Sequence, residues 1–131
     1  MLCTAASRLR RAVSLIAPRR PRSSALRALP GASDYHVPVL GKECIDWLAR
    51  DDGIFVDCTL GGGGHSSLLL ERVGARAKVV GLDRDRDAID AASARIRDAR
   101  FSTIEGVFDE GLQRAFEAHG KFTGVLMDLG V

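Results

Sequence analysis

The sequence predicts an α/β fold with about four parallel strands and helices on both faces of the sheet. From residue 34 onward, short apolar segments alternate with segments of helical period, as in strands joined by crossover helices. The strand-like segments are almost wholly apolar, which is typical of a sheet covered on both sides. The 131 residues are 46% hydrophobic and 27% charged, a composition and length that suit one globular domain.

The first expected elements are a helix, a strand and a second helix. Residues 42–49 (KECIDWLA) have helical period, with four residues on one face: Cys44, Ile45, Trp47 and Leu48. Residues 53–60 (GIFVDCTL) are apolar, β-branched and aromatic, and therefore predict a strand. After four glycines, residues 65–73 (HSSLLLERV) predict a helix that stops at Gly74.

The middle of the chain repeats this alternation. Residues 78–83 (KVVGLD) predict a second buried strand, and residues 100–105 (RFSTIE) a third, weaker one. Between them Asp85 is placed to cap a helix that runs from residue 86 to about residue 97. The apolar positions of that helix are Ala88, Ile89, Ala92 and Ile96.

The last expected helix and strand complete the pattern. Residues 108–120 (FDEGLQRAFEAHG) predict a helix that ends at Gly120. Four of its residues are expected to point inward: Phe108, Leu112, Ala115 and Phe116. Residues 124–131 (GVLMDLGV) predict a fourth strand.

The first 33 residues differ in composition from the rest of the chain. They contain seven Arg and no Asp, Glu or Lys, so residues 34–131 hold the other 12 of 19 basic residues and all 17 acidic ones, a balance of −5. An Arg-, Ser- and Ala-rich segment without acids is typical of a mitochondrial transit peptide. A secretory signal and a nucleic-acid-binding arm are rival interpretations. We predict that residues 1–33 are a disordered transit peptide and linker, and that residues 34–131 are the folded part.

Two features exclude other classes of protein. No apolar run approaches the roughly 20 residues that a membrane span needs, so we expect no stable membrane association. Cys3, Cys44 and Cys58 lie far apart without C-x-x-C spacing, which favours neither a disulfide framework nor a metal site.

The glycines at residues 61–64 follow a predicted strand and precede a predicted helix. A flexible linker would have polar flanks instead. Glycines at such a turn allow positive φ and close approach of a ligand to the backbone. A phosphate-binding loop requires Lys after the last glycine, and this chain has His65 there. The match to the dinucleotide fingerprint is weak, because the motif ends in Ser66.

An S-adenosylmethionine pocket fits this part of the sequence better. Asp83 ends the second predicted strand, 19 residues after Gly64, where a carboxylate can accept hydrogen bonds from both ribose hydroxyls. Asp57 ends the first strand. For Asp57 two interpretations stay open, a ligand-binding acid or a polar residue satisfied by nearby backbone amides.

Five blocks of sequence together resemble the MraW/RsmH family of S-adenosylmethionine-dependent rRNA methyltransferases. They are HVPVL, GIFVDCTLGGGGHS, VVGLDRDRDAI, FSTIEGVFDE and GVLMDLGV, in the family's order and spacing from about residue 35 to the end. The resemblance implies a Rossmann-like class I methyltransferase sheet, of which this chain carries the N-terminal part. It also implies methylation of the exocyclic N(4) of a cytosine in small-subunit rRNA.

The resemblance implies a set of cofactor-binding residues: Gly63, Gly64, His65, Asp83, Phe108 and Asp128. Phe108 is expected near the adenine. Asp128 is also the best catalytic candidate, because an acceptor at the end of the fourth strand could take a hydrogen bond from the cytosine amine. No metal is implied. With the Arg-rich leader, the mitochondrial member is the nearest resemblance, so we expect the mitochondrial matrix, small-subunit rRNA as substrate and ribosome-assembly factors as further partners.

The sequence departs from the family at its end. In the family the last block continues as D-L-G-V-S-S-x-Q with further strands, whereas this chain stops at Val131. We therefore expect an incomplete domain with an unpaired apolar edge at residues 124–130, inactive as a methyltransferase by itself. Two alternatives remain: a non-catalytic half-domain that binds a partner, and an NAD-dependent oxidoreductase with the same strand–glycine–helix unit.

Overall fold

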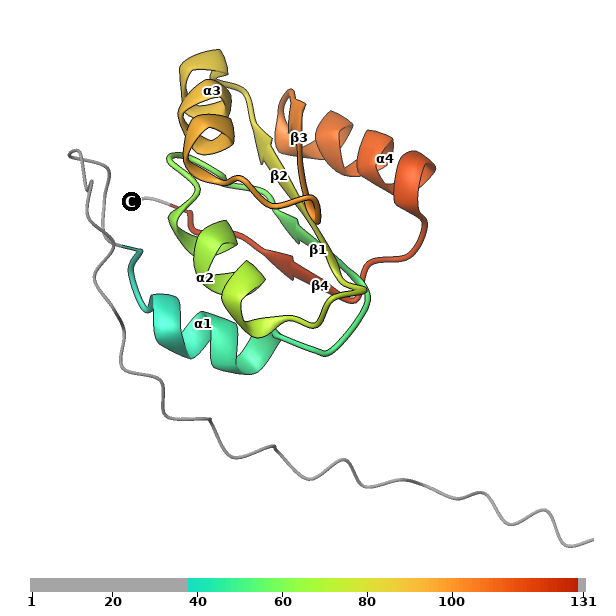
Figure 1. The fold of residues 1–131 in the computed structure, drawn as a ribbon. Helices are drawn as coiled ribbons and strands as arrows, with labels where there is room; N and C mark the ends of the chain where they lie inside the picture. Colours follow the sequence, from blue (N-terminus) through green and yellow to red (C-terminus); the bar gives the residue numbers. More distant parts are fainter. Residues whose placement is uncertain (1–37, 130–131) are drawn as a thin grey trace, which may run out of the picture. The chain divides into compact units, whose positions relative to one another are not determined.

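The computed structural model describes residues 38–129, which form a four-stranded parallel sheet between helices (Figure 1). This confirms the predicted α/β fold. The predicted leader of residues 1–33 lies outside the described residues. The elements are α1 (Gly41–Leu48), β1 (Ile54–Asp57), α2 (Gly64–Arg72), β2 (Lys78–Asp83), α3 (Arg86–Arg95), β3 (Phe101–Glu105), α4 (Phe108–His119) and β4 (Gly124–Leu126).

The strand order creates a switch point between β1 and β4. The sheet has the order β3-β2-β1-β4, and every neighbouring pair is parallel. The chain therefore moves from β1 outward to β3 and then returns to the other side of β1 (Figure 1). In open parallel sheets, ligands bind beyond the carboxyl ends of the strands at this point.

Alternate residues of the strands build two apolar layers. Phe55 and Val79 face α1 and α2, where they pack with Ile45, Leu69, Leu70, Val73 and Ala77. The opposite face packs against α4 in a cluster of Val56, Cys58, Val80, Leu82 and Ala115. The α3 helix adds Ile89 and Ala92, which pack with Leu60 and Phe101. Helices on both faces agree with the apolar strands of the sequence.

The prediction for the buried face of α4 was wrong at two positions. Phe108 and Phe116 are each 53% exposed, whereas Gly111 and Ala115 are buried. An ideal Cβ on Gly111 would lie 3.1 Å from Leu82 Cδ1. The helix therefore approaches the sheet through small residues, which leaves no room there for aromatic rings.

Two other expectations also need correction. Trp47 was expected to share one face of the helix with Ile45, but its side chain is 83% exposed while Ile45 is buried. The strand β4 ends at Leu126, whereas the predicted strand ran over residues 124–131, of which the last two lie outside the described residues. Within residues 38–129 it is an edge strand paired with β1 alone, so its main chain has ladder partners there on one side only.

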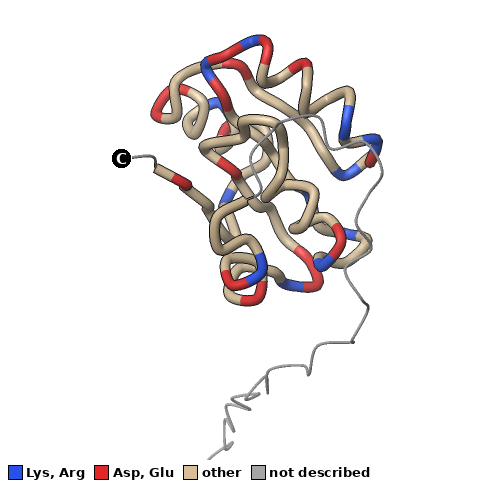
Figure 2. The backbone as a smooth tube through the Cα atoms, turned by 90° about the vertical axis from the view of Figure 1, so that its left-hand side faces the viewer, with Lys and Arg blue, Asp and Glu red and all other residues tan. Residues whose placement is uncertain are grey.

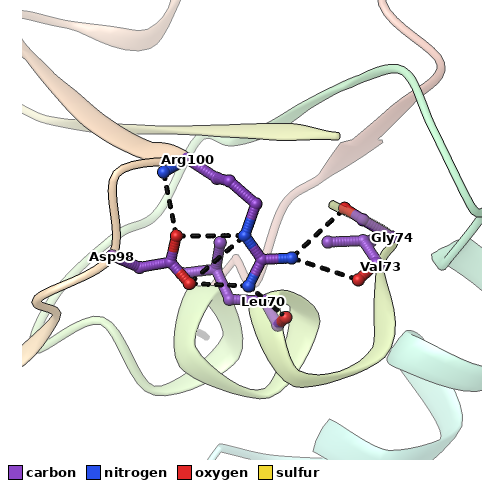
Figure 3. A network of polar contacts seen from close by, with 5 residues as sticks. All are labelled: Leu70, Val73, Gly74, Asp98 and Arg100. Atoms are coloured by element: carbon purple, nitrogen blue, oxygen red, sulfur yellow. Dashed lines mark hydrogen bonds and ion pairs between the residues drawn. The ribbon is translucent and has the colours of Figure 1, made fainter. Parts of the chain in front are cut away.

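Arg100 fixes the C-terminal end of α2. Its guanidinium donates hydrogen bonds to three main-chain carbonyls around that end, those of Leu70, Val73 and Gly74, at 2.8–3.2 Å (Figure 3). Asp98 holds the guanidinium with a contact of 2.6 Å. Helix ends leave carbonyls without partners. Arg100 therefore anchors the C-terminal end of α2, which is the end opposite the glycine-rich start.

Candidate functional site

The glycine loop forms a tight turn between β1 and α2. Gly61 and Gly63 have φ angles of 47° and 76°, a region in which residues with a Cβ are strained. The two glycines serve different purposes. A Cβ on Gly63 would lie 2.8 Å from Ile96 Cδ1, whereas a Cβ on Gly61 would meet nothing within 4 Å. Gly63 thus permits close packing on α3, and Gly61 borders open space.

Asp83 holds the loop at its open side. Its Oδ2 accepts a hydrogen bond of 2.8 Å from the Gly61 N–H, and its Oδ1 accepts one of 3.0 Å from the Asp85 N–H. A carboxylate can accept about four hydrogen bonds, so Asp83 retains capacity for two more. The half-buried carboxylate is therefore suited to a ligand with paired hydroxyl groups.

The start of α2 offers main-chain donors. Gly63 is the N-cap, Gly64 is the first helical residue, and no side chain caps this end. The first N–H groups of a helix have no partner within the helix, and they favour a carboxylate or another anion. The donors at this helix end suit a carboxylate, and the Asp83 carboxylate suits hydroxyl groups.

Asp57 has a structural environment rather than an open one. Its side chain is 1% exposed. Oδ2 accepts a hydrogen bond of 2.8 Å from the Ser66 hydroxyl, and Oδ1 accepts one of 3.2 Å from the Thr59 N–H. Burial raises the pKa of this carboxyl, and the two hydrogen bonds oppose the rise. The sequence left two interpretations of Asp57 open, and the observed contacts are those of a polar residue whose hydrogen bonds are made with nearby groups of the chain.

His65 lies between the segment before α1 and the loop after β4. The ring is 7% exposed, and Nε2 donates to the Val39 carbonyl at 3.2 Å. Nδ1 lies 3.9 Å from Asp128 Oδ2, which is too long for a hydrogen bond. His65 thus lies near Asp128 while it binds the main chain at Val39, just before α1.

Asp128 is placed beside the glycine loop by a contact that the sequence did not reveal. Its main-chain N–H donates a 2.8 Å hydrogen bond to the Thr59 hydroxyl, 69 residues away in sequence. Its side chain is 47% exposed. No local pattern indicates this pairing, because it depends on how β4 lies against β1.

Phe108 lies at the same edge through the loop that follows β3. The Gly106 N–H donates to the main-chain oxygen of Asp83 at 2.8 Å, and α4 begins with Phe108 two residues later. Its ring is half exposed. All six residues expected at the cofactor site therefore belong to segments at the carboxyl edge of the sheet.

A shallow, mostly apolar groove of the described residues lies away from the glycine loop. It runs between α1 and the β4 segment, has a volume of about 300 Å³, and is lined by Cys44, Trp47, Leu48, Val125, Leu126 and Met127. None of these residues belongs to the glycine loop or contributes the carboxylate at β2. We place the candidate site at the glycine loop, because hydrogen-bonding groups converge there.

Charges of both signs are interspersed over the described part of the chain. Figure 2 shows Asp and Glu residues among the Lys and Arg residues along the backbone, without an extended basic run in this view. Several Arg residues are paired with acids, as in the contacts of Arg72 with Asp46 and Arg86 with Glu105.

Within residues 38–129, no group of three or more His, Cys, Asp or Glu could hold a metal ion. None of the helices there is long and apolar enough to cross a membrane.

A family model identifies the chain's relatives. The model of the MraW methylase family matches residues 33–131. This chain belongs to the MraW methylase family. Its membership confirms the two expectations that depend on family, a Rossmann-like class I methyltransferase sheet and S-adenosylmethionine as the cofactor.

Curated relatives of this MraW-family chain are named ribosomal RNA small subunit methyltransferase H. The protein of Pseudoalteromonas atlantica is 44% identical over 99 residues, which cover 73% of this chain and 32% of that protein. The protein of Beutenbergia cavernae is 44% identical over 107 residues, 76% of this chain and 32% of that protein. The chain thus spans about a third of the length of these relatives.

Solved structures agree with the fold. A Clostridium thermocellum protein named as an rRNA methylase aligns with a TM-score of 0.51 at 20% identity, covering 61% of this MraW-family chain and 48% of that chain. A conserved hypothetical protein of Streptococcus pyogenes aligns with a TM-score of 0.50 at 21% identity, covering 63% of this chain and 51% of that chain. At these identities the likeness concerns the fold alone.

Proposed function

We propose that the described residues form the S-adenosylmethionine site of an rRNA methyltransferase. The observation that carries the proposal is the Asp83 carboxylate, bonded to the Gly61 N–H at 2.8 Å and retaining acceptor capacity beside open space. Asp83 would accept the ribose hydroxyls, and Phe108 would cover the adenine. The N–H groups at Gly64 and His65 would face the methionine carboxylate.

The proposed substrate is a cytosine of mitochondrial small-subunit rRNA, methylated at the exocyclic N(4). S-adenosylmethionine supplies the methyl group when bound. Asp128, half exposed beside the loop, would orient the amine by accepting its hydrogen bond, and would contact the cofactor on its other side. Orientation of the reacting atoms is the main contribution that the chain can make to such a transfer.

The proposed location is the mitochondrial matrix, with ribosome-assembly factors as further partners. The support is the Arg-rich, acid-free composition of residues 1–33. Fusion of residues 1–40 to a fluorescent protein should direct it to mitochondria. A fusion that stays in the cytosol would exclude this part of the proposal.

Thermal unfolding with added ligands tests the cofactor. The 131-residue chain should show a higher Tm with S-adenosylmethionine and an unchanged Tm with NAD, because only a ligand that binds the folded state stabilises it. A rise with NAD alone would favour the oxidoreductase alternative.

The base and its modified atom require a test in cells. Depletion of the gene product should reduce N(4)-methylcytidine in mitochondrial small-subunit rRNA, measured by mass spectrometry of digested nucleosides. Cytoplasmic small-subunit rRNA from the same cells is the control and should not change. An unchanged mitochondrial level would refute the proposed substrate.

A non-catalytic binding module is the second candidate. The apolar surface beside β4 favours it, since Trp47, Met127 and Leu129 are 83%, 44% and 69% exposed, and an exposed edge strand can pair with another chain. Size-exclusion chromatography should then give a defined complex rather than a monomer. A monomer that binds S-adenosylmethionine would favour the first candidate.

A further inference from the structure

Thr59 lies between the end of β1, which leads into the glycine loop, and the segment that carries Asp128. It follows β1 by two residues and is half-buried. Its main-chain N–H donates to Asp57 Oδ1 at 3.2 Å, and its hydroxyl accepts from the Asp128 N–H at 2.8 Å. One residue therefore connects the end of β1 to the segment after β4.

The segment at Asp128 needs such a contact because the strand ladder ends before it. The Cys58 N–H donates to the Leu126 carbonyl at 2.9 Å, and this bond continues the pairing of Asp57 with Leu126. The next bond along the edge joins the Asp128 N–H to a side-chain hydroxyl instead of a carbonyl of β1. Without this bond the backbone at Asp128 would be free to move, and fixing the backbone of one residue costs about 1–2 kcal/mol in conformational entropy.

Thr59 is itself held by a buried group. Asp57 is 1% exposed, and its second carboxylate oxygen accepts from the Ser66 hydroxyl at 2.8 Å in the first turn of α2. Asp57 thereby fixes the start of α2 directly and the Asp128 segment through Thr59. An Asp side chain that bonds the N–H two residues later sets a local turn, which fixes the main chain from which the Thr59 side chain extends.

We propose that Thr59 is a positioning residue of the cofactor site, which acts by holding Asp128 beside the glycine loop. The inference rests on the proposed function, because it assigns Asp128 a contact with S-adenosylmethionine. The role assigned to Thr59 is indirect, through its contact with Asp128, and includes no contact with cofactor or substrate. Removal of its hydroxyl should release the Asp128 segment and weaken cofactor binding while the glycine loop stays in place.

The experiment compares three variants of the 131-residue chain by calorimetry with S-adenosylmethionine. Thr59→Val keeps the size of the side chain without the acceptor and should raise the Kd about fivefold, the effect of one lost hydrogen bond. Thr59→Ser keeps the hydroxyl and should bind like the wild type. Thr123→Val is the matched control, since the Thr123 hydroxyl accepts from the Ile54 N–H at the opposite end of β1, and its affinity should be unchanged.

A double-mutant cycle separates positioning from a general loss of structure. Since Thr59 acts through Asp128, Thr59→Val should weaken binding no further in an Asp128→Ala background. Amide hydrogen exchange at Asp128 should also accelerate in Thr59→Val and not in Thr59→Ser.

The outcomes distinguish this inference from the proposed function. Equal affinity of Thr59→Val and the wild type, or a further loss in the Asp128→Ala background, would overturn the role of Thr59 and leave the proposed function standing. A wild-type chain that does not bind S-adenosylmethionine would overturn the proposed function, and the positioning role with it.

Discussion

The main-chain N–H of Gly61 donates a 2.8 Å hydrogen bond to Oδ2 of Asp83, a residue 22 positions later that ends the neighbouring strand. The contact joins two features that appear separately in the sequence, the glycine loop and the acid after β2. It means that the loop conformation and the carboxylate position depend on each other. A change at either residue should therefore alter both the loop and the ligand site.

The two positive-φ glycines should respond differently to substitution. Gly61→Ala and Gly63→Ala each introduce about 1–2 kcal/mol of backbone strain. Gly63→Ala should cost a further 1–3 kcal/mol or so, because its Cβ would lie 2.8 Å from Ile96. Gly61→Ala should lower cofactor affinity more, because its Cβ would enter the open side of the loop. Urea unfolding and calorimetry of both variants measure the contrast, and an identical pair of effects would contradict it.

Loss of the Ser66 hydroxyl should destabilise the fold. Ser66→Ala leaves a buried Asp57 oxygen without its donor, at a cost of about 1–3 kcal/mol in the free energy of unfolding. Ser67→Ala is the matched control, because the Ser67 hydroxyl bonds the Gly63 carbonyl that already accepts the Ser67 N–H. The control should change stability by less than about 0.5 kcal/mol. Equal losses in urea unfolding would argue against a special role for Asp57.

The Asp98–Arg100 pair should contribute stability that disappears in acid. Hydrogen bonds from the Arg100 side chain and main chain lower the pKa of Asp98 from 3.8 to about 2. A lowered pKa means that the contribution is present above about pH 4 and is lost as the pH falls toward 2. Asp98→Asn should therefore be less stable than the wild type at pH 7, and the difference should shrink between pH 4 and pH 2. A constant difference across that range would contradict the assignment.

The two cysteines of the described segment should differ in reactivity. Burial raises the pKa of the Cys58 thiol to about 11, so almost none of it is thiolate at pH 8, and the thiolate is the reactive form. Cys44 is partly exposed. Alkylation at pH 8 followed by peptide mass spectrometry should modify Cys44 well before Cys58 in the folded chain. Similar rates for both thiols would show that the region around Cys58 opens readily.

Local sequence patterns predicted the elements best where the signal is local. Residues 78–83 form β2 as expected, and Asp85 caps α3 by accepting the Asp87 N–H. These features depend on apolar composition and on one short side chain. Periodicity failed for Phe116, which lies beside Phe122 in an edge-to-face pair instead of in the core. Helical period identifies one face of α4, but the small residues Gly111 and Ala115 decide which part of it touches the sheet.

The residues of the candidate site could be named from the sequence, but the hydrogen bonds that join their segments could not. The glycine loop, Asp83 and Asp128 were identifiable from the motif and the resemblance, and the structure brings their segments to one edge of the sheet. The contact of Thr59 with Asp128 spans 69 residues, and Ser66 meets Asp57 only because α2 packs back on β1. Such contacts follow from tertiary packing, which no local pattern encodes.

Calorimetric titration of the 131-residue chain with S-adenosylmethionine, repeated for Asp83→Asn, measures whether the glycine loop and Asp83 bind this cofactor. The amide oxygen of Asn can accept from only one of the two N–H groups, those of Gly61 and Asp85, that the carboxylate binds, and the charge that strengthens the ribose contacts is lost. Asp52→Asn, an exposed change before β1, is the control. We predict binding by the wild type and the control, and a Kd at least about tenfold higher for Asp83→Asn. Equal affinity of Asp83→Asn and the wild type, or no binding by the wild type, would contradict it.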